Sequence, residues 1–248
     1  MVKISAVIIT FNEEKNIARC LESIKGIVDE IIVVDSFSKD KTSEICLSHN
    51  VKFIQTDWKG YSETKNFANS KAENDWILSL DADEALSEEL KKSILNAKKT
   101  GFNGCYSFNR LTNYCGTWVK FGGWYPDNKT RLFNRLEVKW TGLIHENLEF
   151  NIPLTTTLLK GDCLHYSYYT VQEHINQTKK FSPIAAEMLQ SKGKKATFVK
   201  RFISPAVKFI RDYFFKLGFL HGRKGFLICA ISGYATYIKY KKLRELNK

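Results

Sequence analysis

The sequence predicts an α/β fold in which a mostly parallel sheet is flanked by helices and followed by a helical extension. Short β-branched runs alternate with segments of helical periodicity through the first hundred residues. Acidic and amide side chains directly follow several of these runs, and positive charge is concentrated in the last quarter of the chain. With 248 residues, 44% of them hydrophobic, the chain is long enough to bury one sizeable core.

The first hundred residues predict four strands separated and followed by helices. The expected strands are residues 4–10, 30–34, 51–55 and 76–80, which are short and apolar. Helical spacing of apolar residues predicts helices ending near Ile24 and over 42–48, 62–72 and 88–97. Asn12 and Ser87 are suitable N-caps for the first and last of these helices. This alternation implies βαβ units with right-handed crossovers, and therefore parallel strands.

The pattern changes near residue 101 to short strands and loops rich in Tyr, Trp and Gly. Helical spacing returns at about 170–191, 197–217 and 222–246, and no repeat or low-complexity linker interrupts the chain. We therefore expect one globular domain over residues 1–190 and a helical extension over 191–248.

Polar side chains follow three of the predicted strands at the point where each strand ends. They are Thr10 with Asn12, Asp35, and Asp81 with Asp83. The carboxyl ends of parallel strands share one edge of a sheet, where ligands bind in α/β folds. We therefore expect these clusters to converge.

The stretch DWILSLDADEAL places Asp81, Asp83 and Glu84 at the end of an apolar strand. Carboxylates this close repel each other unless something neutralises them, and hard cations such as Mg²⁺ or Mn²⁺ prefer oxygen ligands. The alternative is a polar turn before a helix N-terminus, where acids suit the helix dipole. An EF-hand is disfavoured because the segment after Asp83 lacks the required glycine. Glu84 is not included in the predicted cation site.

Several segments together resemble family-two glycosyltransferases of the GT-A fold. They are ISAVIITFNEEKNI, EIIVVDSFSKDKT and KNFANSKAENDWILSLDADE, in the family's order. The later WYPDNKTRLFNR, GLIHENL and DYFFKLGFLHGRKGF are similar to the bacterial lipopolysaccharide-core glucosyltransferase subgroup. This resemblance implies a nucleotide-sugar-binding half over residues 1–100 and an acceptor-binding half over 101–190.

The resemblance also implies roles for individual residues toward a UDP-type donor. Residues bordering the nucleotide pocket would be Thr10, Asn12 and Glu14, while Asp35 would contact the base or ribose. Residues approaching the nucleotide or its phosphates would be Lys65 and Asn66, and by its chemistry Arg131 could add charge-assisted contacts to phosphate. Asp81 and Asp83 would serve the ribose and the metal, with His165 either a third metal ligand or a hydrogen-bonded core histidine. Asp35 could instead only cap the following turn.

An inverting transfer needs a base that accepts the proton of the acceptor hydroxyl. The resemblance points to Glu146, but the family's Glu-Asp pair is replaced here by His145-Glu146. His145 is therefore the alternative base, and Glu146 could instead be a surface acid. Aromatic residues that could line the acceptor pocket, or belong to the core, are Trp118, Trp124 and Tyr125.

The last 58 residues carry fifteen Lys or Arg against two acids, Asp212 and Glu245. Large apolar residues recur there at helical spacing between the basic ones. An amphipathic basic helix of this kind binds anionic membrane surfaces. The alternative is a helical hairpin that packs on the catalytic domain or on a second subunit. The longest uncharged stretch, residues 225–238, is too short to span a bilayer.

The pattern of cysteines and the N-terminal sequence predict the cellular compartment of the protein. The six cysteines form no C-x-x-C pair, so zinc is not expected, and no secretory signal pattern precedes the first strand. We therefore expect reduced cysteines in a cytoplasmic protein, peripheral on the inner face of the cytoplasmic membrane.

These observations predict an inverting, metal-dependent glycosyltransferase that moves glucose or another hexose from a UDP-type sugar to a glycolipid such as lipopolysaccharide core. Polyprenyl phosphate or a protein side chain is the alternative acceptor. A basic nucleic-acid-binding module is the non-enzymatic alternative, but the extension contains no nucleic-acid motif, so no nucleic-acid partner is expected. The sequence leaves open whether the protein forms a homo-oligomer.

Overall fold

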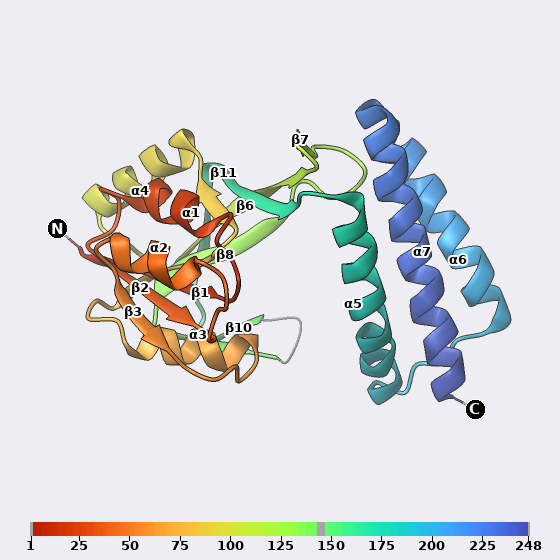
Figure 1. Ribbon diagram of the computed structural model, residues 1–248, viewed down its shortest axis with the longest axis horizontal. Helices are drawn as coiled ribbons and strands as arrows, with labels where there is room; N and C mark the ends of the chain where they lie inside the picture. Colours follow the sequence, from red (N-terminus) through yellow and green to blue (C-terminus); the bar gives the residue numbers. More distant parts are fainter. Residues whose placement is uncertain (1, 143–146, 248) are drawn as a thin grey trace. The chain divides into compact units, whose positions relative to one another are not determined.

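The computed structural model describes residues 2–142 and 147–247, which form two compact units (Figure 1). The sheet unit comprises residues 1–110 and 127–166, and the helical unit comprises 111–126 and 167–248. The chain passes between them three times: within β6 (Cys105–Tyr114), between Pro126 and Asp127, and within β11 (Thr156–Tyr168). This division differs from the predicted boundary at residue 190, because α5 (Val171–Ser191) packs on α7 (Gly222–Leu246).

All four predicted strands of the first hundred residues are present and parallel, in the order β3-β2-β1-β4. Their bounds are Ile4–Thr10 for β1, Glu30–Asp35 for β2, Lys52–Gln55 for β3 and Trp76–Asp81 for β4. The sheet continues through β8 (Asn128–Asn134), β6, β11 and β5 (Glu84–Leu86), and β7 (Thr117–Trp118) pairs with β6. β8 is antiparallel to β4, so parallel pairing is confined to the part of the sheet built from the βαβ units. A separate antiparallel pair consists of β9 (Val138–Thr141) and β10 (Asn147–Phe150).

Helices cover both faces of the parallel strands (Figure 1). One face packs on α1 (Ile17–Ile24), α2 (Thr42–Ser48) and α4 (Glu88–Thr100), and the other on α3 (Tyr61–Ser70). Alternate residues of β1 enter the two cores, as expected for strands buried on both faces. The predicted α/β class is confirmed.

The two predicted N-caps have different outcomes. The Ser87 hydroxyl accepts a hydrogen bond from the Leu90 amide and caps α4 as expected. The prediction for Asn12 is wrong, because α1 begins only at Ile17. Asn12 has a φ of 55° in the preceding loop, a left-handed conformation that asparagine tolerates better than most residues.

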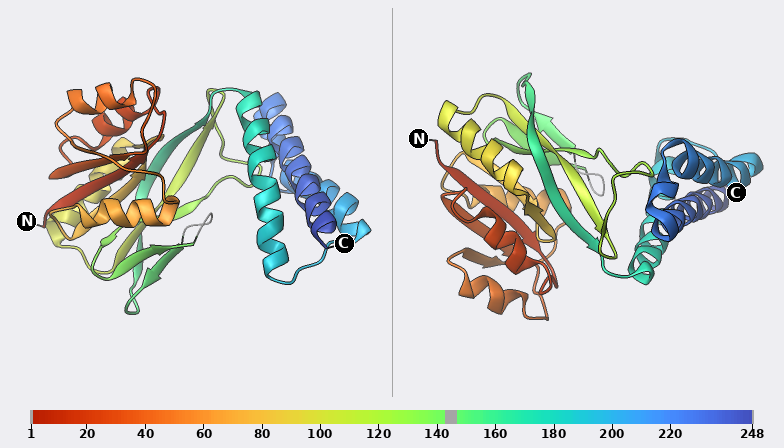
Figure 2. Two further views of the ribbon diagram at one scale, coloured as in Figure 1. Left: turned by 60° about the horizontal axis from the view of Figure 1, so that its bottom comes forward. Right: turned by 90° about the horizontal axis from the view of Figure 1, so that it is seen from above.

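The helical unit contains α5, α6 (Phe198–Ile210) and α7, with α7 packed against both of the others (Figure 2). A π-helical turn, η1 (Arg211–Phe215), and a 3₁₀ turn, η2 (Gly218–His221), connect α6 to α7. The predicted C-terminal helical extension is therefore confirmed. Within residues 2–142 and 147–247, every helix is too short or too polar to cross a membrane.

Candidate active site

The polar ends of β1, β2 and β4 meet at one edge of the sheet, as predicted. In the strand register, Thr10 lies opposite Asp35, and Ile9 lies opposite Asp81. The loops that follow these strands therefore begin side by side. This edge is where ligands bind in parallel α/β sheets.

Two cations hold the carboxylate of Asp81. Lys65 Nζ, on α3, lies 2.9 Å from one carboxylate oxygen, and Arg131 Nη2, on β8, lies 2.8 Å from the other. Burial alone would raise the pKa of Asp81, but the positive charges of Arg131 and Lys65 hold it well below its usual range. Asp81 is therefore a fixed, ionised acceptor at the sheet edge.

Glu84, which the sequence reasoning set aside, supports this arrangement from β5. It is 1% exposed, and its Oε2 accepts a hydrogen bond of 2.9 Å from the Asp81 backbone amide. Its Oε1 lies 3.3 Å from Arg131 Nη2 and 3.6 Å from Arg110 Nη1. Buried carboxylates require such partners, so Glu84 and Arg110 complete the charge balance around Arg131. The sequence signal that could have identified Glu84 was the position of this acid directly after D-x-D and beside an apolar run.

Asp83 faces a different partner from Asp81. Its Oδ2 lies 3.1 Å from Nε2 of His165, which β11 places opposite Glu84. Burial alone would lower the pKa of His165, but the Asp83 carboxylate outweighs this and raises it. The two groups predicted from D-x-D and from His165 are thus adjacent, whereas both Asp81 oxygens are occupied by cations.

Glu13 is a further acid in this region that the sequence reasoning missed. Burial is the largest cause that raises its pKa, to about 7, and a hydrogen bond from Asn16 opposes this while Asp83 and Asp40 add to it. The sequence signal was weak, because a glutamate before a helix normally serves the helix dipole.

Asp83 and His165 fit a divalent cation by their chemistry. A carboxylate oxygen and an imidazole nitrogen are both metal ligands, and the nitrogen favours Mn²⁺ over Mg²⁺. No group of three or more His, Cys, Asp or Glu in the described part of the chain is arranged to hold a metal ion.

Asp35 is buried at the end of β2 and its carboxylate is occupied by neighbouring groups. It accepts hydrogen bonds from the Ser38 amide at 2.9 Å, from the Ser38 hydroxyl, and from the Gln55 side chain at 3.0 Å. Asp35 thus caps the turn after β2, and its contact with the base or ribose of a nucleotide stays a prediction. The buried hydroxyl of Thr10, opposite it, has no hydrogen-bond partner among the described residues.

Asn12 and Glu14 are exposed and connect the two loops after β1 and β2. Asn12 Oδ1 accepts from the Lys39 amide at 2.8 Å, and Glu14 Oε2 accepts from the Lys41 amide at 3.1 Å. These bonds fix the loops that flank the sheet edge. Direct contact of either residue with a nucleotide stays a prediction.

Asn66 positions an aromatic wall of the site. Its amide both donates to the Trp140 carbonyl (2.8 Å) and accepts from the Trp140 amide (3.0 Å). The Trp140 ring in turn lies 4.9 Å from Lys65 Nζ. Asn66 therefore holds Trp140, and Trp140 stacks against the lysine that neutralises Asp81.

A cavity of about 550 Å³ opens beside this cluster in the sheet unit. Its walls come from β4, β6, β8, β9 and β10 and comprise Asp81, Arg110, Asn128, Lys129, Thr130, Arg131, Trp140, Asn147, Leu148 and Phe150. Positive side chains on one wall and aromatic rings on another suit an anionic, sugar-bearing ligand.

The predicted bases, His145 and Glu146, lie outside the described residues. Asn147, the next residue, lines the cavity and pairs with Thr141 across β9 and β10. The three candidate aromatic residues belong to the helical unit, where Trp124 packs in the core and Tyr125 lines a separate cavity. Trp118, on β7, is half-buried.

The chain is similar to known proteins over most of its length. The family model described as Glycosyl transferase family 2 matches residues 5–151. The glycosyltransferase RP128 of Rickettsia prowazekii is 34% identical over 100% of this chain and 88% of its own length. The lipopolysaccharide core biosynthesis glycosyltransferase LpsC of Rhizobium meliloti is 29% identical over 93% of this chain and 85% of its own.

Among solved structures, S. aureus TarS (residues 1–349) is 16% identical with a TM-score of 0.48, covering 99% of this chain and 91% of its own. The family model matches more than half of the chain, and a relative above 30% identity spans all of it. The chain therefore belongs to glycosyl transferase family 2 and is a glycosyltransferase.

Proposed function

We propose that the protein is an inverting glycosyltransferase that moves glucose or another hexose from a UDP-type nucleotide sugar to a glycolipid acceptor of the lipopolysaccharide-core type. The observation that carries this proposal is that the two aspartates of the D-x-D segment have different partners. Asp81 is held between Lys65 and Arg131, and Asp83 lies against His165, at the edge of the sheet where the nucleotide would bind.

Asp81 would receive the donor's ribose. Lys65 and Arg131 keep its carboxylate ionised and in one orientation, ready to accept a hydrogen bond from a ribose hydroxyl. Arg131 and Arg110 line the cavity and supply positive charge toward phosphate groups. The buried Thr10 hydroxyl, which has no partner among the described residues, would gain one from a nucleotide at this edge.

Asp83 and His165 would hold the divalent cation. When bound between these two side chains, such an ion would supply Lewis-acid stabilisation for the negative charge of the diphosphate leaving group. Imidazole binds a metal as the neutral base, so His165 has to lose its proton before it can serve as a ligand.

Glu146 is the proposed base, with His145 as the alternative. The base accepts the proton of the acceptor hydroxyl as that oxygen attacks the anomeric carbon, which inverts the configuration there. Support comes from the neighbouring Asn147, which lines the cavity next to Asp81.

The glycolipid acceptor is supported by likeness to LpsC, whose name refers to lipopolysaccharide core biosynthesis, and by the basic, apolar extension. These features favour an enzyme that is peripheral on the inner face of the cytoplasmic membrane. An acceptor displayed at that surface and a soluble nucleotide sugar would then meet at the enzyme.

A donor screen followed by a transfer assay tests this function. UDP-sugars with Mn²⁺ should raise the melting temperature of the protein more than GDP-sugars do, and more than UDP-sugars do without metal. Glu146→Gln should keep donor binding and lose transfer to extracted glycolipid, whereas His145→Gln should retain most transfer. Failure of every nucleotide sugar to bind would contradict the proposal. Glycosylated peptide or polyprenyl phosphate as the product would contradict the glycolipid acceptor.

A further inference from the structure

A second cavity, of about 400 Å³, lies wholly within the helical unit. Its walls include Lys120, Phe121, Tyr125, Phe215 and Lys216. None of these residues belongs to the donor site described above. Two ammonium groups beside aromatic rings make this an anion-binding type of cavity.

Hydrogen bonds fix the two segments that form the cavity. The Gly122 amide donates to the Lys216 carbonyl at 2.8 Å. His221 Nε2 accepts from the amides of Lys120 and Phe121 at 3.1 and 3.2 Å. Gly123 has a φ of 82°, which favours glycine, and it lets the end of the Lys216 side chain lie close to the loop, because a Cβ there would be 2.8 Å from Lys216 Cδ. The cavity is therefore built by the fold.

The positive charge of the cavity is not balanced by the described part of the protein. No carboxylate among residues 2–142 and 147–247 lies within salt-bridge distance of the Lys120 or Lys216 ammonium groups. Asp212, one of two acids in the extension, is buried and already pairs with Lys208 and Arg211. An anionic ligand would supply the missing charge.

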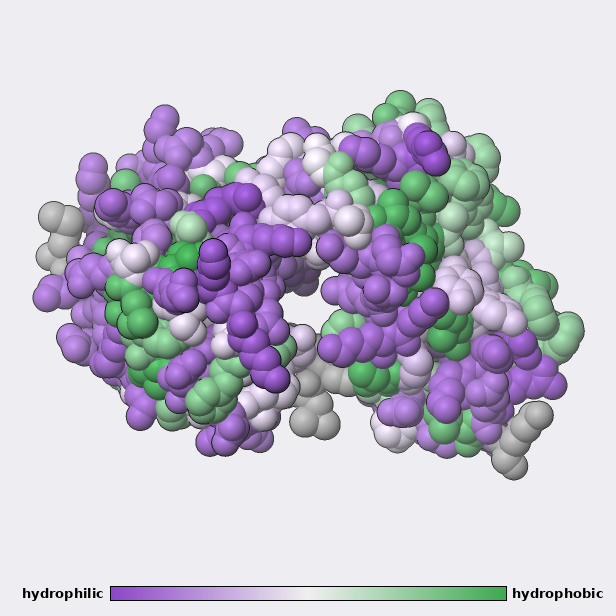
Figure 3. Space-filling view, in the orientation of Figure 1, coloured by the Kyte–Doolittle hydropathy of each residue, from purple (hydrophilic) through white to green (hydrophobic). Residues whose placement is uncertain are grey.

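Exposed apolar side chains continue from the cavity along α6. Phe215, at the cavity wall, is 79% exposed. We define the apolar stripe as the exposed residues Val199, Ile203, Val207 and Ile210, spaced four, four and three residues apart on α6. This spacing puts them on one side of the helix. Figure 3 shows hydrophobic residues gathered over the C-terminal helices.

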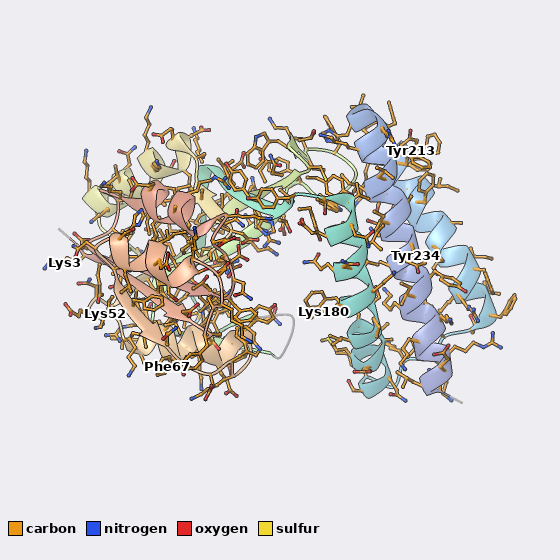
Figure 4. All side chains as sticks on the ribbon, in the orientation of Figure 1. Lys3, Lys52, Phe67, Lys180, Tyr213 and Tyr234 are labelled. Atoms are coloured by element: carbon orange, nitrogen blue, oxygen red, sulfur yellow. The ribbon has the colours of Figure 1, made fainter. Side chains whose placement is uncertain are left out.

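The opposite side of α6 already packs within the helical unit. Arg201 donates a 2.7 Å hydrogen bond to Tyr237 of α7, and Phe209 contacts Phe226 at 5.6 Å between ring centroids. Tyr213, labelled in Figure 4, stacks on Phe209 at 5.3 Å and anchors η1. The stripe is thus the side of α6 that remains for a partner.

We propose that this cavity binds the phosphate-bearing head group of an anionic phospholipid, while Phe215 and the apolar stripe enter the bilayer. The inference rests on the proposed membrane association and names the site and lipid class that would produce it. Charge decides against a second copy of the chain, because two such extensions would bring thirteen net positive charges each to one contact. A bilayer containing anionic lipid supplies both the apolar interior and the negative surface.

The test measures binding of the full chain to vesicles of phosphatidylcholine with and without phosphatidylglycerol. Binding should require phosphatidylglycerol. It should weaken about 25-fold in the Lys120→Gln, Lys216→Gln double variant, because each lysine contributes about fivefold. The matched control removes two exposed lysines of α5, Lys179→Gln with Lys180→Gln, and should weaken binding much less. Phe215→Ser and Ile203→Ser should each weaken binding while the thermal melt of the protein stays unchanged.

Each contrary result contradicts a particular part of the proposal. Equal losses of vesicle binding in the Lys120/Lys216 variant and in the Lys179/Lys180 control would overturn the cavity site, because diffuse positive charge would then explain binding. Equal binding to neutral vesicles would overturn the head-group assignment and leave membrane association intact. No vesicle binding would overturn both, while nucleotide-sugar binding stays a separate measurement. Self-association that Ile203→Ser abolishes, without an effect on vesicles, would assign the stripe to a second copy.

Discussion

The ammonium group of Lys65 lies 2.9 Å from the Asp81 carboxylate, with the lysine 1% and the aspartate 29% exposed. A lysine this deeply buried must have a negative partner, since an isolated charge in the interior is strongly unfavourable. Arg131 approaches the same carboxylate and also lies 3.3 Å from Glu84, so two acids and two cations balance each other in this cluster. The D-x-D segment is therefore part of an ion-pair network that also involves α3, β5 and β8.

Lys65→Met should destabilise the protein and weaken donor binding. It removes one of the two cations on Asp81, and breaking a buried pair costs about 3 kcal/mol. Urea unfolding measures this loss in the free energy of unfolding. Lys71→Met, an exposed lysine just after α3, is the control and should change it by less than about 0.5 kcal/mol. A loss no larger than that of the control would contradict the network.

Glu84→Gln should lower stability by about 2 kcal/mol, because the substitution removes the negative charge next to the buried Arg131. It should also weaken UDP-sugar binding, since Arg131 and Asp81 lose a shared support. Glu88→Gln on α4, whose exposed carboxylate pairs with Lys91, is the matched control. Equal unfolding curves for the two variants would show that Glu84 has no structural role.

His174 should make the protein less stable in acid. It is buried among Tyr114, Trp124 and Tyr168, and this burial lowers its pKa to about 4 from the usual 6.5. Between these values the unfolded chain binds a proton that the folded chain does not, so stability falls as pH drops through this window. The loss amounts to about 3 kcal/mol in total. His174→Phe should remove this component when unfolding is measured at several pH values, and an unchanged pH profile would contradict it.

The convergence of Thr10, Asp35 and Asp81 could be predicted because it depends on local signals and one topological rule. Each residue ends an apolar run, and parallel strands place such ends at one edge. The helical spacing of apolar residues also predicted the helix that ends at Ile24, which is α1, and its Ile17, Leu21 and Ile24 are buried.

The partners within the site could not be predicted, because they depend on tertiary register. Arg131 reaches Asp81 through the antiparallel pairing of β8 with β4, which aligns Leu132 with Leu78. His165 reaches Asp83 through the pairing of β11 with β5. No local pattern specifies either alignment. The start of α1 was misplaced because Asn12 uses its side chain to hold the neighbouring loop.

Calorimetric binding of UDP with and without Mn²⁺ tests the central claim, that Asp83 and His165 form the metal site of a nucleotide-sugar enzyme. Mn²⁺ should strengthen UDP binding to the native protein by at least about tenfold, and both Asp83→Ala and His165→Ala should abolish that gain while metal-free binding persists. Asp57→Ala, which removes an exposed acid outside the site, should retain the gain. Metal-independent UDP binding that neither variant alters would contradict the claim.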